Sequence, residues 1–228
     1  PRDRARLAEP SSWSCAHGVG RWSTDCGCKI SPDRDWHQRW RAPYRALLER
    51  VRDDARRVLA EQGSSLFADA VSARDAYGQV IGRPERFAAW YAAHAGSAPD
   101  ADLARQWLEC QRNLLAMFTS CAWFFDEVTG IEPVQNLRHA SCAVSMVKQL
   151  TGVDFSSTLE ADVLALPSNQ DVTVLQPVLR DSQVPPPAST TPDVAGFSIR
   201  QAGVLQPVSA LPGSGPIGDL DAAEGFVD

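Results

Sequence analysis

Four side chains that can bind a metal ion lie close together near the start of the chain: Cys15, His17, Cys26 and Cys28. Thiolates and an imidazole are the donor types that tetrahedral zinc prefers, and it needs four of them. Zinc motifs usually separate paired cysteines by about two to four residues, so that both can reach one ion. Cys26 and Cys28 are separated only by Gly27. The segment therefore has the composition of a zinc site without its usual spacing.

Two other interpretations of this segment remain open. In the first, the thiols are small buried side chains of a compact loop, and His17 bonds to the backbone. In the second, Cys26 and Cys28 form a disulfide across one glycine, which would be strained and regulatory. Neither helical nor strand periodicity runs through residues 12–28, so each interpretation predicts an ordered loop.

A second group of candidate residues consists of Trp123, Asp126 and Glu127. On a helix this spacing lets the indole share a face with either acid, and an aromatic plane beside carboxylates suits a sugar. Adjacent helical side chains diverge by about 100°, so the two acids cannot act together as the acid and base of a glycosidase. The alternative is a core tryptophan next to a solvated helix end.

The elements that must position these residues are predicted to be helices. Apolar residues repeat at intervals of three and four through most of the chain, and no stretch alternates as a strand would. We expect an all-α, antiparallel helical array with the helix over 100–129 at its centre. The first expected helix starts at Ser31-Pro32 and has a kink at Pro43. Further helices are expected over 66–81, over 84–95, over 100–129 with a left-handed Gly130 at its end, and from Pro133 to about 151 with Gly152 at its end. A last helix is capped by Ser157 and Glu160 and ends before Pro167.

Composition divides the chain near residue 168. Every Trp, Tyr, Cys and His precedes that point, and Pro- and Gly-rich stretches follow it. We predict an ordered Cys/Trp-rich loop over 1–30 packed on the helices, a helical domain over 31–167, and a largely disordered tail over 168–228.

The charge of the whole chain excludes some partners. A net charge of −6 argues against nucleic acid and against anionic membrane surfaces, because both require a basic excess. No apolar run reaches the ~18 residues of a spanning helix. The chain is long and apolar enough to fold without disulfides, so we expect reduced thiols and a cytoplasmic location. Because the chain begins at Pro1, we also expect a fragment of a longer protein.

Three blocks of the sequence resemble a known protein family. Residues 12–28 (Ser-Trp-Ser-Cys-x-His-Gly-Val-x-Arg-Trp-x-x-Asp-Cys-Gly-Cys), 36–43 and 119–132 are similar, in the same order, to bacterial proteins related to glycoside hydrolase family 57. The resemblance spans about residues 11–170. In that family these blocks form an uncharacterised helical region after an incomplete β/α barrel, which carries the catalytic carboxylates. The resemblance therefore implies no catalytic residue here.

The resemblance suggests a non-catalytic wall of a glycan cleft, completed by an upstream catalytic barrel and taking an α-glucan or related carbohydrate. No cofactor is expected for that function. The alternative is a helical metal-binding or redox module with zinc at the cysteine cluster. We further expect the loop 12–28 to fold against Trp123 and Phe124, with His17 and Arg21 beside the two acids. The substrate-side candidates are Trp13, His17, Arg21, Trp22, Trp123, Asp126 and Glu127.

Overall fold

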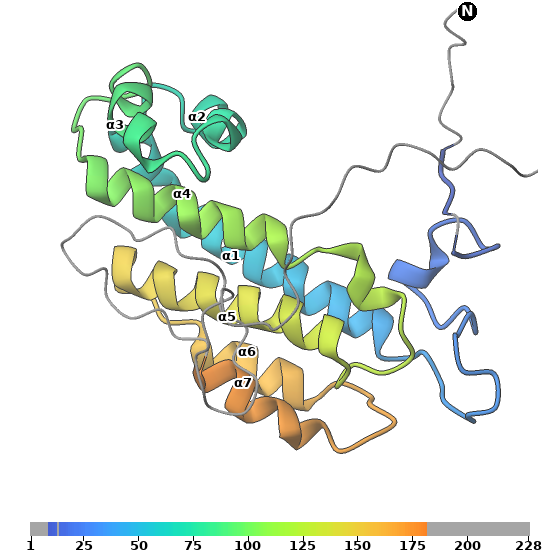
Figure 1. Ribbon diagram of the computed structural model, residues 1–228. Helices are drawn as coiled ribbons and strands as arrows, with labels where there is room; N and C mark the ends of the chain where they lie inside the picture. Colours follow the sequence, from blue (N-terminus) through green and yellow to red (C-terminus); the bar gives the residue numbers. More distant parts are fainter. Residues whose placement is uncertain (1–8, 13, 182–228) are drawn as a thin grey trace, which may run out of the picture. The chain divides into compact units, whose positions relative to one another are not determined.

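The computed structural model describes residues 9–12 and 14–181 (Figure 1). Within them the chain is helical, and its only β pairing is an isolated bridge between Phe67 and Ala95. The predicted all-α class is confirmed. The helices are α1 Arg41–Leu66, α2 Ala70–Ala76, α3 Pro84–Ala92, α4 Ala101–Ala116, α5 Ile131–Thr151, α6 Ser156–Leu164 and α7 Gln176–Asp181, with 3₁₀ turns η1 Gly20–Trp22, η2 Tyr77–Gln79, η3 Ser120–Trp123 and η4 Val172–Leu175.

The core lies between three long helices. α1 and α5 run in one direction and α4 runs in the other (Figure 1). Each contributes an apolar stripe at intervals of three and four residues, which is what buries one side of a helix. On α1 the stripe is Tyr44, Leu47, Leu48, Val51, Ala55 and Leu59, all buried. Trp107 of α4 packs there too, and its indole N–H donates to the Leu59 carbonyl at 3.1 Å.

The central helix predicted over 100–129 is wrong in its second half. α4 ends at Ala116, and the chain continues as η3 and irregular backbone to Gly130. Thr119 is extended, and Trp123 turns its ring into the core against Tyr44, at 5.1 Å between ring centroids. Gly130 is not left-handed; it has φ −68° and precedes the first residue of α5. Apolar residues alone cannot distinguish this buried turn from a helix, because both bury the same side chains.

The predicted helix start at Ser31 is also wrong. α1 begins at Arg41, and the Ser31 N–H donates to Asp126 at 2.7 Å. Pro43 therefore lies in the first turn of α1, where a missing N–H costs nothing and causes no kink. The hydrogen bond to Asp126 holds Ser31 in the loop that precedes the helix.

Of the other predicted helix boundaries, some are confirmed and others are wrong. The helix start at Pro84 and the left-handed Gly152 (φ 77°) are confirmed. α6 is present and ends at Leu164, but the predicted capping box is absent. Ser157 lies inside the helix, and the N-cap residue is Phe155, whose side chain makes no capping hydrogen bond. The helix predicted over 66–81 is reduced to α2 and η2, because Phe67 is extended and Asp69 caps α2.

The start predicted for the tail, residue 168, is too early in the sequence. η4 and α7 follow that point, and Leu175 and Leu179 are buried. The rest of the predicted tail, 182–228, lies outside the described residues. Among the helices that are described, none is long and apolar enough to cross a membrane.

The contact between α1 and α4 gives a first prediction. A Cβ added at Gly63 would lie 2.8 Å from the Trp107 ring. The hydrogen bond from the Trp107 indole to the Leu59 carbonyl holds that ring in place. Alanine normally stabilises a helix relative to glycine. We expect Gly63→Ala instead to lower the free energy of unfolding by about 1–3 kcal/mol, through overpacking.

Urea denaturation followed by tryptophan fluorescence measures this effect. Gly78→Ala is the matched control, because nothing lies within 4 Å of a Cβ at that position. A stabilised Gly63→Ala variant would contradict the packing described here.

Candidate metal centre

Local turns bring the four predicted ligands together. Gly18 and Gly27 have positive φ values of 64° and 75°, which glycine adopts without strain. Between them η1 reverses the chain, and the Thr24 N–H donates to the Gly20 carbonyl at 2.8 Å. Cys26 and Cys28 are thereby returned to Cys15. The glycines thus explain how a cluster with unusual spacing can close.

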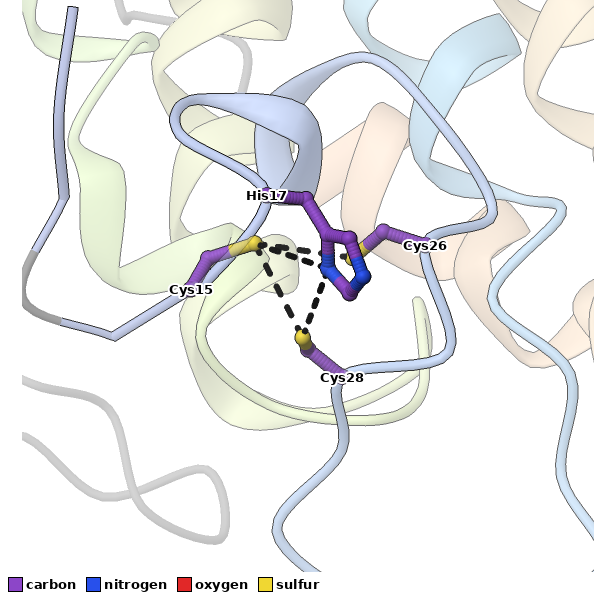
Figure 2. A group of neighbouring side chains, drawn as sticks. All are labelled: Cys15, His17, Cys26 and Cys28. Carbon is purple, nitrogen blue, oxygen red and sulfur yellow. Dashed lines mark hydrogen bonds between the residues drawn. The ribbon is translucent and has the colours of Figure 1, made fainter.

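The side chains of Cys15, His17, Cys26 and Cys28 converge on one point (Figure 2). Their ligand atoms all lie within 4.8 Å of one another. Cys15 Sγ is 3.8 Å from Cys26 Sγ and 3.7 Å from Cys28 Sγ, and His17 Nδ1 is 3.4 Å from Cys28 Sγ. Zinc–sulfur bonds of about 2.3 Å in a tetrahedron imply sulfur–sulfur edges of about 3.8 Å. The spacing of these atoms matches that geometry.

The cysteines are thiols rather than disulfides. All six are free, and the predicted alternative of a Cys26–Cys28 disulfide is not formed. Burial by itself would raise the pKa of Cys15, but hydrogen bonds from the His17 backbone and ring lower it to about 6. Burial and the neighbouring sulfurs of Cys15 and Cys26 raise the pKa of Cys28. Three thiols this close cannot all ionise without a cation to offset their mutual repulsion.

A buried arginine touches the cluster. Arg41, at the start of α1, is 0% exposed. Its Nη1 donates to the Cys28 carbonyl at 2.9 Å and lies 3.7 Å from Cys26 Sγ, and its Nη2 donates to the Phe125 carbonyl at 3.3 Å. Burial and the Arg21 guanidinium lower the pKa of Arg41. Within residues 9–12 and 14–181 no carboxylate forms an ion pair with it, and the Cys26 sulfur is the side-chain group to which its guanidinium donates.

The loop packs against the segment 120–127, as the sequence predicted. Asp126, 5% exposed, accepts hydrogen bonds from the N–H groups of Ile30 and Ser31. Arg21 donates to the Phe124 carbonyl, with its guanidinium carbon 5.2 Å from the centre of the Phe124 ring. These contacts join two segments about a hundred positions apart in the sequence.

The predicted substrate-side residues are not gathered into one open pocket. Trp123 is 0% exposed, and its indole N–H donates to the Arg41 carbonyl at 3.4 Å. Glu127, 5% exposed, accepts from the Ser168 hydroxyl and from the Asn169 backbone and side chain. His17 belongs to the cysteine cluster, so the prediction that it lies beside these acids is not supported.

The other two predicted residues on the loop differ in their surroundings. Trp22 is half-buried and lines a surface groove, together with Ser12, Arg45 and Glu49. Trp13 lies outside the described residues. Among the predicted aromatic residues that the structure describes, Trp22 is therefore the one that a ligand in this groove could contact.

Two groups of this site are absent from the residues predicted from the sequence. Arg41 was not singled out, although its place between Trp40 and Tyr44 puts a cation inside an apolar stripe, which is the available signal. Asp25 was also missed; its carboxylate accepts from the Gln38 N–H at 2.8 Å and so holds the loop near the start of α1. No sequence spacing indicated that contact.

Comparison with protein families identifies the chain. Residues 36–175 match the model of a family described as Domain of unknown function (DUF3536). The chain belongs to this family. No curated protein and no solved structure matches it. The comparisons do not show the expected link to glycoside hydrolase family 57. The match includes Arg41 and Asp126, whereas the four candidate ligands precede it.

Asp126 provides a prediction for this site. We expect Asp126→Ala to lower the free energy of unfolding by about 2–4 kcal/mol, because the N–H groups of Ile30 and Ser31 lose a charged acceptor that is itself buried. The same substitution should make the segment 14–40 more sensitive to limited proteolysis, since it is then held less firmly. Urea denaturation and mass spectrometry of the cleavage products measure the two effects.

The exposed carboxylate Asp53, which pairs with Arg52, provides the control. Asp53→Ala should leave both measurements close to wild type, because exposed pairs contribute little. Equal effects of the two substitutions would show that Asp126 does not anchor the loop.

Proposed function

We propose that the chain is a helical domain whose N-terminal segment is organised by one structural zinc ion. The ion is held by Cys15, His17, Cys26 and Cys28. The observation that carries the proposal is the convergence of four ligand atoms within 4.8 Å of one another, at distances that fit a zinc tetrahedron. A cluster of this composition suits zinc better than calcium or magnesium, which take oxygen ligands.

The ligand number supports a structural ion rather than a catalytic one. Catalytic zinc keeps one coordination position open for water, whereas structural zinc is closed by four protein ligands. Three thiolates and a neutral imidazole around Zn²⁺ carry a net charge of about −1. Arg41, buried and without a carboxylate ion pair in the described structure, supplies the opposite charge beside Cys26.

The proposed ion stabilises the loop where it meets the helical core. Cys28 is followed directly by Lys29, Ile30 and Ser31, and the last two donate to Asp126. The Cys28 carbonyl accepts from Arg41, which also donates to the Phe125 carbonyl. Fixing Cys28 therefore fixes the contacts of both segments. A reducing, cytoplasmic compartment is part of this proposal, because the ligands must remain thiolates.

Zinc loading tests the proposal. The chain purified under reducing conditions should contain one zinc per molecule by elemental analysis, and Cys26→Ser should lose most of it, because one tetrahedral ligand is gone. Cys121→Ser is the control, since Cys121 is an exposed thiol outside the cluster. Cobalt in place of zinc should show the absorption of tetrahedral thiolate coordination. A chain without metal, or equal loading of the two variants, contradicts the proposal.

The groove at Trp22 favours a second candidate function, a wall of a glycan cleft in a family 57-like protein. An indole beside Arg45 and Glu49 has the mixed aromatic and charged character of a sugar site. This function requires an upstream β/α barrel as its catalytic partner and an α-glucan as ligand. The burial of Trp123, Asp126 and Glu127 argues against their part in it.

A binding measurement tests this candidate. If the groove binds sugar, the purified chain should be retarded by soluble starch in affinity electrophoresis, and Trp22→Ala should abolish the retardation. Trp36→Ala is a control, because this indole packs under Arg34, at 4.2 Å from the ring centre, and does not line the groove. Equal mobility with and without starch would remove the glycan function for this chain.

A further inference from the structure

The three cysteines of the cluster differ in the hydrogen bonds that their sulfurs receive. Cys15 is buried and accepts from the backbone N–H groups of His17 and Arg21. Cys26 is half-buried and lies next to the Arg41 guanidinium, 3.7 Å from Nη1. Cys28 is also half-buried, but the described structure gives its sulfur no N–H donor apart from the other ligands. The cluster is therefore asymmetric.

This asymmetry has a chemical consequence for a metal-bound thiolate. A hydrogen bond to sulfur withdraws the electron density that a nucleophile needs, and a buried sulfur is closed to reagents. Arg41 protects Cys26 in the first way, and burial together with backbone N–H groups protects Cys15. Cys28 has neither protection, because it is only half-buried and its sulfur receives, within the described residues, no N–H donor other than a ligand of the cluster.

We propose that Cys28 is the reactive sulfur of the cluster, and that hydrogen peroxide oxidises it to a disulfide with Cys15 and so expels the metal. This inference rests on the proposed zinc site. Cys15 is the partner because its sulfur lies 3.7 Å from that of Cys28. A bridge to Cys26 would span a single glycine and would be strained.

The reaction balances as a two-electron oxidation of the thiolate pair. The Cys28 sulfur attacks one peroxide oxygen, the O–O bond breaks, and hydroxide leaves, which gives a sulfenic acid. The Cys15 thiolate then attacks the sulfenic sulfur, the S–S bond forms, and a second hydroxide leaves. The two hydroxides take two protons from solvent, so that one peroxide becomes two waters. The ion keeps only His17 and Cys26 as ligands and dissociates.

The loss of the ion reaches the helical core through the residues next to Cys28. Its carbonyl accepts from Arg41, and Ile30 and Ser31 donate to Asp126. A new bond at Cys28 shifts this short stretch. Oxidation of one sulfur therefore loosens the contact between the loop and the segment 120–127.

Labelling of the zinc-loaded full chain with limiting N-ethylmaleimide tests the order of reactivity. Peptide mapping should show Cys28 modified about tenfold or more faster than Cys26 or Cys15. Arg41→Gln should raise the rate at Cys26 more than the rate at Cys28, because the guanidinium contacts the sulfur of Cys26 but only the carbonyl of Cys28. Cys121, exposed and outside the cluster, is the internal reference for an unprotected thiol. If Arg41→Gln does not fold, the order in the wild-type chain decides by itself.

Hydrogen peroxide tests the second step. One zinc should be released for each Cys15–Cys28 disulfide, measured with a chromogenic chelator and by peptide mapping, and Cys28→Ala should form no disulfide at Cys15. A chain purified without metal overturns the proposed zinc site. A zinc-loaded chain in which Cys26 or Cys15 reacts first, or in which all three react alike, overturns only the assignment to Cys28.

Discussion

The buried guanidinium of Arg41 connects the cysteine cluster to the helical core, and the arrangement of the N-terminal segment depends on it. Its Nη1 faces the backbone of Cys28 and the sulfur of Cys26, and its Nη2 faces Phe125. A charge with no exposed surface must have compensating groups around it. The described structure offers it the carbonyl oxygens of Cys28 and Phe125 and the sulfur of Cys26. In the proposed zinc site the negative charge of the thiolates would offset the charge of the arginine.

Buried carboxylates hold the neighbouring segments in a similar way. Asp126 accepts backbone N–H groups that follow the cluster, and Glu127 accepts from Ser168 and Asn169, beyond α6. Asn169 also donates to the His37 carbonyl at 3.0 Å. Each acid is satisfied by donors from a distant part of the sequence, which specifies one arrangement of irregular segments that apolar packing alone would leave undefined.

The family match covers the helical core and stops before the proposed ligands. It nevertheless contains the residues on which the loop rests, Arg41 and Asp126, together with Asn169. These polar groups of the core are the hydrogen-bond partners of the segment that contains the cysteine loop, and that segment covers them. In the proposed zinc site the metal supplies what a short, glycine-rich loop lacks, because such a loop buries too little apolar surface to fix its own conformation.

The sequence by itself determined the all-α class, the ligand types of the cluster, and boundaries that depend on local backbone chemistry, such as Pro84 at the start of α3 and the left-handed Gly152. Periodicity and the special backbones of proline and glycine act locally, so they can be read from neighbouring residues. Only the tertiary structure decided that α1 begins at Arg41 and that α4 ends at Ala116. Contacts between residues distant in the sequence accompany those limits: Ser31 donates to Asp126, and the Trp123 ring packs on Tyr44. Distant contacts also bury Trp123 and Asp126, two predicted substrate-side residues, and they bring Arg41 to the cysteines.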